Sequence, residues 1–285
     1  MRNVGYYDGQ VGLIEEMRVP MNDRACYFGD GVYDATYAKE GVPFLLEDHI
    51  DRFYGSANAL EIAFDMPKEA LKALILDLIA KVDDPDAMVY WQLTRGTAMR
   101  GHAFPKEAKS NLWVLIYPKA MHALSDRLHL ITVPDTRYLH CNVKTLNLVP
   151  NVMAAQRAAE AKCEEVAFHR DGVVTEGSHS NLHILKDGAL RTAPLSRYIL
   201  PGITRKHLLR LARANGIPVC EEAFTVEEMM AADEVLVTSA GTLCCAVDTI
   251  DGKPVGGRAP ELLAALQGAY EKELKEAIAN AKGSI

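Results

Sequence analysis

The sequence predicts a mixed α/β fold in two lobes. Short apolar runs with β-branched and aromatic residues, typical of strands, alternate with segments whose apolar residues recur at helical spacing. A chain of 285 residues is also long for one hydrophobic core and comfortable for two. Residues 118–126 place Pro, Lys, Ser and Asp between two strand-like runs. We therefore expect an N-terminal α/β domain at 1–118, a linker at 119–126 and a C-terminal domain at 127–285.

The elements of the first lobe follow from these two patterns, the strand-like apolar runs and the helical spacing of apolar residues. We expect strands at 26–37, 88–94 and 112–117, and helices at 46–60 and 67–82. The buried face of the first helix would consist of Ile50, Phe53, Ala57 and Leu60. Asp65 is the expected N-cap of the second helix. The buried stripe of that helix would consist of Leu71, Leu74, Ile75 and Leu78.

In the second lobe, turn and capping residues mark the elements. Three Asp-Gly pairs, at 171–172, 187–188 and 251–252, predict tight hairpin turns, because both residues tolerate positive φ. Thr225 and Glu228 form a predicted capping box, and Gly216 is expected to end the preceding helix. Strands are expected at 128–133 and 234–237, and helices at 152–163, at 204–215 and from 260 onward.

Composition narrows the classes of protein to consider. The formal net charge of −7 argues against nucleic acid or an anionic membrane as the partner. No long apolar run predicts a membrane span, and the first residues do not resemble a secretory signal, so we expect a cytoplasmic protein. The six cysteines include no C-x-x-C pair, which favours buried thiols over a disulfide framework. The nine histidines form no ligand pattern, so no metal is expected.

Three features of the second lobe point to chemistry. Lys144, in the segment CNVKTLNLVPN, is expected to follow an apolar strand and to be partly buried; a neutral amine can form a Schiff base with an aldehyde. Glu176 ends the run VVTEG and could be an active-site acid. In ILPGITR, Gly202 permits a close backbone approach, and Thr204 opens a helix whose N-terminus suits a phosphate. Taken singly, each has a plainer interpretation, namely a surface lysine, a turn cap and an ordinary capped turn.

Taken together, these pieces resemble the pattern of the class IV, or fold type IV, pyridoxal-phosphate aminotransferases. The pattern consists of Lys144, then EGSHSN from Glu176, then Thr192, then LPGITR at 200–205. It extends to YFGDGVYD at 27–34 and EDHIDRFYGSA at 47–57, and so covers nearly the whole chain. His183 departs from it, since the family usually has Phe or Tyr there. The resemblance implies a smaller N-terminal α/β lobe and a larger C-terminal pseudo-barrel lobe.

The resemblance also implies the roles of the cofactor-binding residues. Lys144 would form the Schiff base with pyridoxal 5′-phosphate and move the substrate proton. Glu176 would keep the pyridine nitrogen protonated, so that the ring accepts electrons. Arg52 would bind the phosphate with a planar, permanently charged fork. Further cofactor contacts are implied for Leu200, Ile203, Thr204, Ser239 and Thr242. Arg137 could face the cofactor or form a structural ion pair.

The segment RGTAMRGHAFP at 95–105 gives the best indication of the substrate. It resembles the substrate-carboxylate loop of the D-amino acid aminotransferases, with Arg100, His102 and Tyr33 as the carboxylate-binding set. The resemblance implies transamination between a D-amino acid, such as D-alanine or D-glutamate, and a 2-oxo acid. It also implies a homodimer whose loop reaches the neighbouring subunit's site.

Other functions remain open at this point. A branched-chain L-amino acid aminotransferase or an aminodeoxychorismate lyase would share the same lysine and glutamate. A catalytically silent cofactor-binding protein would be an alternative of another class. Lys144, Glu176, Arg52 and the phosphate turn occur together, which argues against a silent protein. The pair Arg100 and His102 favours the D-amino acid aminotransferase over the other two enzymes.

Overall fold

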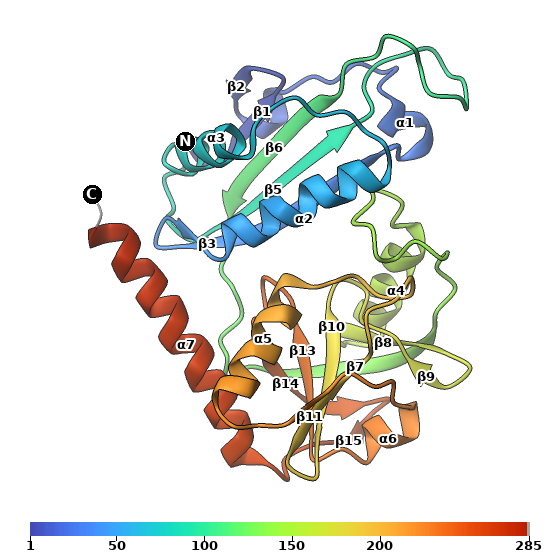
Figure 1. Cartoon of the computed structure of the whole chain (residues 1–285), viewed down its shortest axis with the longest axis vertical. Coiled ribbons are helices and arrows are strands. Elements are labelled where there is room, and N and C mark those ends of the chain that lie inside the picture. Colours follow the sequence, from blue (N-terminus) through green and yellow to red (C-terminus); the bar gives the residue numbers. More distant parts are fainter. Residues whose placement is uncertain (284–285) are drawn as a thin grey trace. The chain divides into compact units, whose positions relative to one another are not determined.

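The computed structural model describes residues 1–283 and divides into two compact units. The first comprises Met1–Met121, Val143–Asn147 and the end of the chain from Ala277, and the second comprises His122–Asn142 and Leu148–Glu276. Figure 1 shows both sets of elements along the chain. The domain limits 1–118, 119–126 and 127–285 stay a prediction. The predicted mixed α/β class is confirmed, because helices pack on a sheet in each unit.

The first unit is built on a six-stranded antiparallel sheet with the order β2-β1-β6-β5-β3-β4. Its strands are β1 Val4–Tyr7, β2 Gln10–Gly12, β3 Gly31–Lys39, β4 Val42–Pro43, β5 Ala87–Thr94 and β6 Asn111–Pro118. Its helices are α1 Arg24–Phe28, α2 Leu46–Ala59 and α3 Lys68–Ile79, with a 3-10 turn at Ile14–Glu16. The strands predicted at 88–94 and 112–117 are confirmed as β5 and β6.

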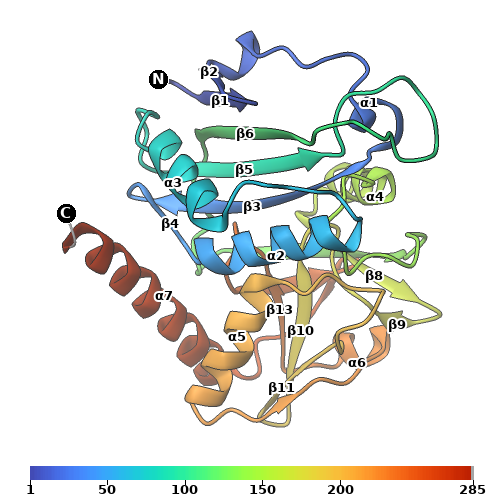
Figure 2. The same ribbon diagram turned by 45° about the horizontal axis from the view of Figure 1, so that its top comes forward.

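Helices α2 and α3 lie on the same face of this sheet (Figure 2). Their apolar stripes form one core with the inward side chains of the central strands, among them the fully buried Phe53, Leu71 and Trp91. Both predicted helices are therefore confirmed. The predicted N-cap of α3 is wrong, because Pro67 occupies that position and makes no side-chain capping bond.

The predicted strand at 26–37 is wrong in its first part, because residues 24–28 form the short helix α1. The side chain of Asp23 accepts a hydrogen bond from the backbone N–H of Ala25, and Gly29 ends the helix in the left-handed region at φ 60°. An N-cap and a C-cap that enclose only five residues thus override the strand propensity of Tyr27 and Phe28. The strand begins at Gly31.

The second unit is built on a nine-stranded mixed sheet with the order β12-β11-β10-β13-β14-β7-β8-β9, in which β15 pairs with β14. The strands before the middle helices are β7 Arg127–Pro134, β8 Glu165–Arg170, β9 Val173–Val174, β10 Asn181–Lys186 and β11 Ala189–Thr192. The later strands are β12 Val219–Cys220, β13 Glu234–Thr238, β14 Cys245–Ile250 and β15 Lys253–Pro254. Strand β7 lies between β14 and β8 and is parallel to both.

The turns and caps predicted for the second unit are confirmed. The aspartates of all three Asp-Gly pairs have φ between 48° and 50°, and each pair closes a hairpin. Thr225 and Glu228 make both bonds of the capping box. The helices are α4 Val149–Glu160, α5 Ile203–Ala214, α6 Val226–Met230 and α7 Pro260–Gly283. Helix α4 begins and ends three residues before the predicted limits, because Pro150 sits in its first turn and Lys162 has φ 58°.

No described helix is long and apolar enough to cross a membrane. No group of three or more candidate ligand side chains within residues 1–283 could hold a metal ion. The six cysteines are free thiols, of which Cys141, Cys244 and Cys245 are buried.

A fully buried histidine lies in the centre of the second sheet. His183, on β10, is 0% exposed, and its Nε2 lies 2.8 Å from Oγ1 of Thr238 on the neighbouring strand β13. Burial, with a smaller contribution from Arg205, lowers the pKa of His183 from 6.5 to about 3. The ring is therefore neutral in the folded protein at ordinary pH.

This burial predicts a pH-dependent stability. Below pH 6.5 the unfolded chain binds a proton at His183 that the folded chain does not accept above pH 3. The contribution of His183 to the free energy of unfolding should thus be lost as pH falls through this window, by up to about 1.4 kcal/mol per pH unit. Urea unfolding should show that the free energy of unfolding depends less steeply on pH in His183→Phe than in the wild type. His183→Gln is the control for packing. Equal slopes in all three proteins would contradict the assignment.

Candidate active site

Lys144 lies on a short segment that extends the edge of the first sheet. The backbone N–H of Tyr33 donates to the carbonyl of Lys144 at 2.9 Å, and Leu146 N donates to the carbonyl of Gly31 at 3.1 Å. Val143 is buried in the core of the first unit. Backbone pairing with the start of β3 therefore places the lysine. The expectation that Lys144 directly follows a strand is wrong, since β7 ends at Pro134.

The lysine side chain lies over an aromatic ring. Its Nζ is 4.3 Å from the centroid of Tyr33, which stacks on Tyr90 at 5.4 Å between ring centroids. Ser56 Oγ, on α2, accepts a hydrogen bond from the backbone N–H of Lys144 at 3.2 Å. Lys144 is partly buried, as the sequence predicts. The structure thus brings together Lys144 and Tyr33, two of the predicted site residues.

A buried carboxylate fixes the direction of Arg52. Asp34, on β3, is 0% exposed and accepts two hydrogen bonds from the Arg52 guanidinium, at 2.8 and 2.9 Å. The ring of His49 contacts the same carboxylate at 2.8 Å. Burial alone would raise the pKa of Asp34, but Arg52 and His49 more than offset it and hold that pKa well below its usual range. Burial lowers the pKa of His49, against the opposing effect of Asp34.

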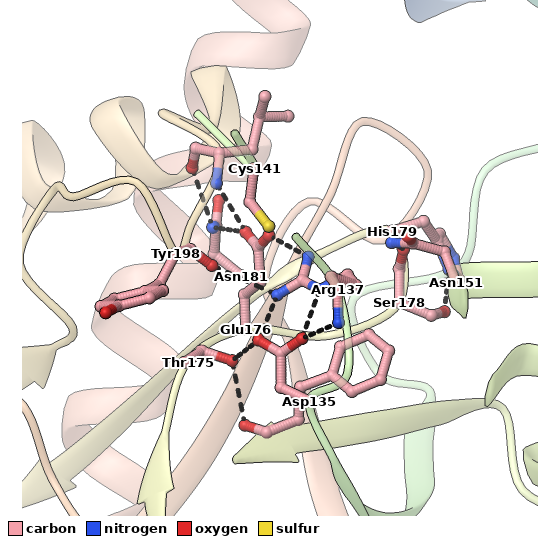
Figure 3. A network of polar contacts seen from close by, with 12 residues as sticks. Asp135, Arg137, Cys141, Asn151, Thr175, Glu176, Ser178, His179, Asn181 and Tyr198 are labelled. Atoms are coloured by element: carbon pink, nitrogen blue, oxygen red, sulfur yellow. Dashed lines mark hydrogen bonds and ion pairs between the residues drawn. The ribbon is translucent and has the colours of Figure 1, made fainter. Parts of the chain in front are cut away.

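Glu176 is the centre of a polar network in the second unit (Figure 3). The carboxylate is buried and accepts a hydrogen bond from Nη1 of Arg137 at 2.6 Å. Its other oxygen accepts from Nδ2 of Asn181 and from the backbone N–H of Leu200, both at 2.9 Å. Donors from three separate segments therefore orient this carboxylate.

Arg137 links Glu176 to a second buried acid. Its Nε and Nη2 donate to Asp135 at 3.0 and 2.9 Å, and Arg170 donates to the same carboxylate at 3.2 Å. Burial alone would lower the pKa of Arg137, but Asp135 and Glu176 together raise it above its usual value. Two carboxylates and two guanidinium groups thus balance in charge. Of the two roles open for Arg137, the structural ion pair is the one that the geometry shows.

The turn after Glu176 is held by Glu165 at the start of β8. This buried carboxylate accepts hydrogen bonds from the hydroxyls of Ser178 and Ser180 at 2.6 and 2.7 Å. It also accepts from the backbone N–H of Ser178 at 2.9 Å. Burial alone would raise the pKa of Glu165, but His179, the two serines and a backbone N–H lower it. Glu165 therefore fixes the backbone that connects Glu176 to Asn181.

The predicted phosphate helix begins directly after Gly202. The N-cap Gly202 has φ −62°, and a Cβ at this position would lie 1.9 Å from Oδ1 of Asn181. Ile203 and Thr204, in the first turn of α5, are buried, and Tyr270 donates to the carbonyl of Thr204 at 2.6 Å. The first N–H groups of a helix have no partner within it, so this N-terminus suits an anion.

The predicted phosphate turn brings two hydroxyl groups together. Oγ of Ser239 and Oγ1 of Thr242 lie 3.0 Å apart, and the backbone N–H of Thr242 donates to Ser239 Oγ at 3.2 Å. The turn directly follows β13, whose last residue Thr238 contacts His183. Ser239 and Thr242 therefore form one local donor set.

The predicted substrate loop carries Arg100 and His102 on its exposed tip. The Arg100 guanidinium lies 5.2 Å from the ring centroid of Phe28, and the His102 ring lies 5.3 Å from the same ring. Both predicted residues therefore meet at one aromatic side chain of α1. Gly96, at φ 103°, starts the loop where a Cβ would lie 2.0 Å from the carbonyl of Lys109.

Sequence reasoning missed the buried acids that orient the site residues. Asp34 lies within the quoted motif YFGDGVYD, and its signal is a charge in the middle of a strand that is otherwise buried. Glu165 opens the apolar run of β8 and gives the same signal. Asp135 gives none, because a single acid two residues before an arginine is common on protein surfaces.

The model of the family described as "Amino-transferase class IV" matches residues 31–250. This chain belongs to the class IV aminotransferases. The match contains Lys144, Glu176 and the phosphate turn.

Individual relatives of this class IV aminotransferase cover nearly all of its length. The D-alanine aminotransferase of Staphylococcus aureus strain MSSA476 is 35% identical over 274 residues, which are 95% of this chain and 97% of that protein. The D-alanine aminotransferase of Bacillus licheniformis is 36% identical over 256 residues, 89% of this chain and 90% of its own. A solved branched-chain amino acid aminotransferase of Escherichia coli superposes with a TM-score of 0.86 at 22% identity. It covers 95% of this chain and 93% of its own.

The close approach at Gly202 gives a testable prediction for this aminotransferase. Gly202→Ala should destabilise the fold by about 1–3 kcal/mol, because the new methyl group must displace Asn181. The same substitution at Gly268, a residue of α7 with nothing within 4 Å of an added Cβ, should be neutral or stabilise by up to about 1 kcal/mol. Urea unfolding measures both. A variant Gly202→Ala as stable as Gly268→Ala would show that the backbone at 202 adapts freely.

Proposed function

We propose that this class IV aminotransferase uses pyridoxal 5′-phosphate to transfer an amino group between a D-amino acid and a 2-oxo acid. The observation that carries the proposal is the 35% identity over 95% of the chain to the staphylococcal D-alanine aminotransferase. The Arg100 and His102 loop supports it, because a guanidinium and an imidazole supply hydrogen-bond donors suited to a carboxylate.

The residues of each unit fit the groups of this cofactor. A dianionic phosphate suits the α5 N-terminus, the hydroxyls of Ser239 and Thr242, and the guanidinium of Arg52. A pyridinium nitrogen suits Glu176, since a carboxylate can pair with a protonated ring nitrogen and Arg137 holds this one in place. When bound, pyridoxal phosphate supplies the electron sink that transamination requires. The amine that joins its aldehyde carbon would be Nζ of Lys144.

Once released from the cofactor, Lys144 has the role of moving a proton. Its Nζ amine would accept the proton that leaves Cα of the amino acid and would hold it for return. Tyr33 supports this role, because its ring centroid lies 4.3 Å from Nζ. Leu200, whose backbone N–H donates to Glu176, is the apolar residue proposed to pack on the ring of the cofactor.

The preference for a D-amino acid is attributed to the residues proposed to bind the substrate carboxylate. Arg100 and His102, with Tyr33, would bind the α-carboxylate and so decide which face of the amino acid meets Lys144. The homodimer in which this loop reaches the neighbouring subunit's site belongs to the same proposal. The cytoplasmic location expected from the sequence stays a prediction.

Cofactor binding can be tested by absorbance. The protein purified with pyridoxal phosphate should be yellow, and Lys144→Ala should lose this absorbance because the amine that joins the cofactor is gone. Lys119→Ala, at an exposed lysine of the first unit, should keep the colour. A colourless wild type that takes up no pyridoxal phosphate would refute the proposed cofactor and the transamination that depends on it.

The substrate class can be tested with two amino donors. With 2-oxoglutarate as acceptor, kcat/KM for D-alanine should exceed that for L-leucine by roughly 100-fold, because a fixed carboxylate set selects one face of the substrate. Turnover of L-leucine alone would instead identify a branched-chain enzyme, the function of the solved structure with a TM-score of 0.86. Pyruvate release from aminodeoxychorismate without net transamination would identify the lyase. No turnover of any substrate by yellow protein would favour a silent cofactor-binding protein.

A further inference from the structure

Arg24 is a buried arginine bound to the loop that carries Arg100 and His102. It belongs to α1, and its side chain is only 4% exposed. Its Nη1 donates to the carbonyl of Gly101 at 2.7 Å, and longer bonds of 3.4 Å reach the carbonyls of His102 and Ala103. One guanidinium therefore contacts three consecutive carbonyls at the tip of the loop.

Asp30 fixes this guanidinium and ties it to the start of the same loop. The carboxylate accepts from Nε of Arg24 at 2.7 Å and from Nε of Arg95 at 2.9 Å. Arg95 precedes the loop and donates to the carbonyl of Leu60 at 2.7 Å, at the end of α2. The tip and the start of the loop are thus connected through a single carboxylate.

The ring of Phe28 adds a second contact to the tip. The Arg24 guanidinium lies 5.0 Å from its centroid, the Arg100 guanidinium 5.2 Å and the His102 ring 5.3 Å. Each is within range of a cation–π or aromatic contact. The two side chains proposed to bind substrate therefore share one ring with Arg24, although both are themselves exposed.

We propose that Arg24 is a positioning residue for the substrate carboxylate, acting through Arg100 and His102. This inference rests on the proposed function, in which those two residues bind the carboxylate. An exposed loop that is mobile before binding loses conformational freedom when substrate binds, which weakens affinity. Arg24 orders the loop beforehand, so Arg100 and His102 meet the carboxylate at a smaller entropic cost.

A double-mutant cycle on the holoenzyme tests this role. Arg24→Gln should raise KM for D-alanine about tenfold, since charge-assisted hydrogen bonds to the loop are lost. The kcat and the cofactor absorbance should stay close to the wild-type values, because Arg24 contacts neither Lys144 nor the residues proposed to bind the cofactor. In the Arg100→Ala background, Arg24→Gln should raise KM by clearly less than tenfold, because one of the two residues that it positions is gone.

Amide hydrogen exchange gives a readout that is independent of turnover. Exchange in the loop segment 97–104 should accelerate in Arg24→Gln, while the β5 and β6 strands keep their protection. Arg24→Lys should show an intermediate KM, since an ammonium group can bond one carbonyl but cannot span three. Phe28→Leu, which leaves Arg24 and Asp30 in place, should also raise KM and serves if Arg24→Gln does not fold. The matched control is Arg18→Gln, at an exposed arginine that donates to nearby carbonyls, which should leave KM unchanged.

The outcomes separate this inference from the proposed function. If Arg100→Ala raises KM but Arg24→Gln and Phe28→Leu do not, the positioning role is refuted and the carboxylate role stands. If the effects of Arg24→Gln and Arg100→Ala on KM multiply fully, Arg24 acts by another route and the inference also fails. If Arg100→Ala leaves KM unchanged, the carboxylate role itself is refuted. Loss of cofactor colour in folded Arg24→Gln would likewise overturn the inference.

Discussion

The second unit depends on a carboxylate that is buried inside the protein. Burying an unpaired charge is very costly, and Glu176 is paired with Arg137 at 2.6 Å. Arg137 also pairs with Asp135, and Arg170 supplies the second positive charge that balances the two acids. The position of the turn at 175–181 and the start of α5 then follow, because Asn181 and Leu200 donate to the same carboxylate.

The first unit also pairs its charged side chains away from solvent, but with the signs of charge exchanged. There an acid stands between two basic groups, with the buried Asp34 between Arg52 and His49, and the partly buried Asp30 between Arg24 and Arg95. In each case the acid lies on or next to the start of β3. These acids orient the basic groups and so restrict long flexible side chains to fewer rotamers.

The sequence predicted what local patterns encode. The helical stripes of α2 and α3, the three Asp-Gly turns and the capping box at Thr225 each depend on a few neighbouring residues, and each was confirmed. It did not predict α1, because a five-residue helix is too short to show a periodicity. It also missed the pairing of 143–147 with β3 and the acids Asp34, Asp135 and Glu165. The pairing joins segments far apart in the chain and leaves no local signal, and Asp135 resembles an ordinary surface charge. Asp34 and Glu165 do leave a signal, namely a charge within a strand that is otherwise buried. Chemically distinctive residues such as Lys144 and Arg100 were predicted through the family resemblance.

The contact between Gly202 and Asn181 constrains how this protein can change over evolutionary time. The amide of Asn181 occupies the space where any side chain at position 202 would begin, and its other end donates to Glu176. A larger residue at 202 would be accommodated only after Asn181 had been replaced by a shorter residue. That shorter residue at 181 would remove one hydrogen-bond donor from the Glu176 carboxylate. The two positions, 21 apart in sequence, can therefore drift only together. Among descendants of this chain, a change at 202 should be accompanied by one at 181.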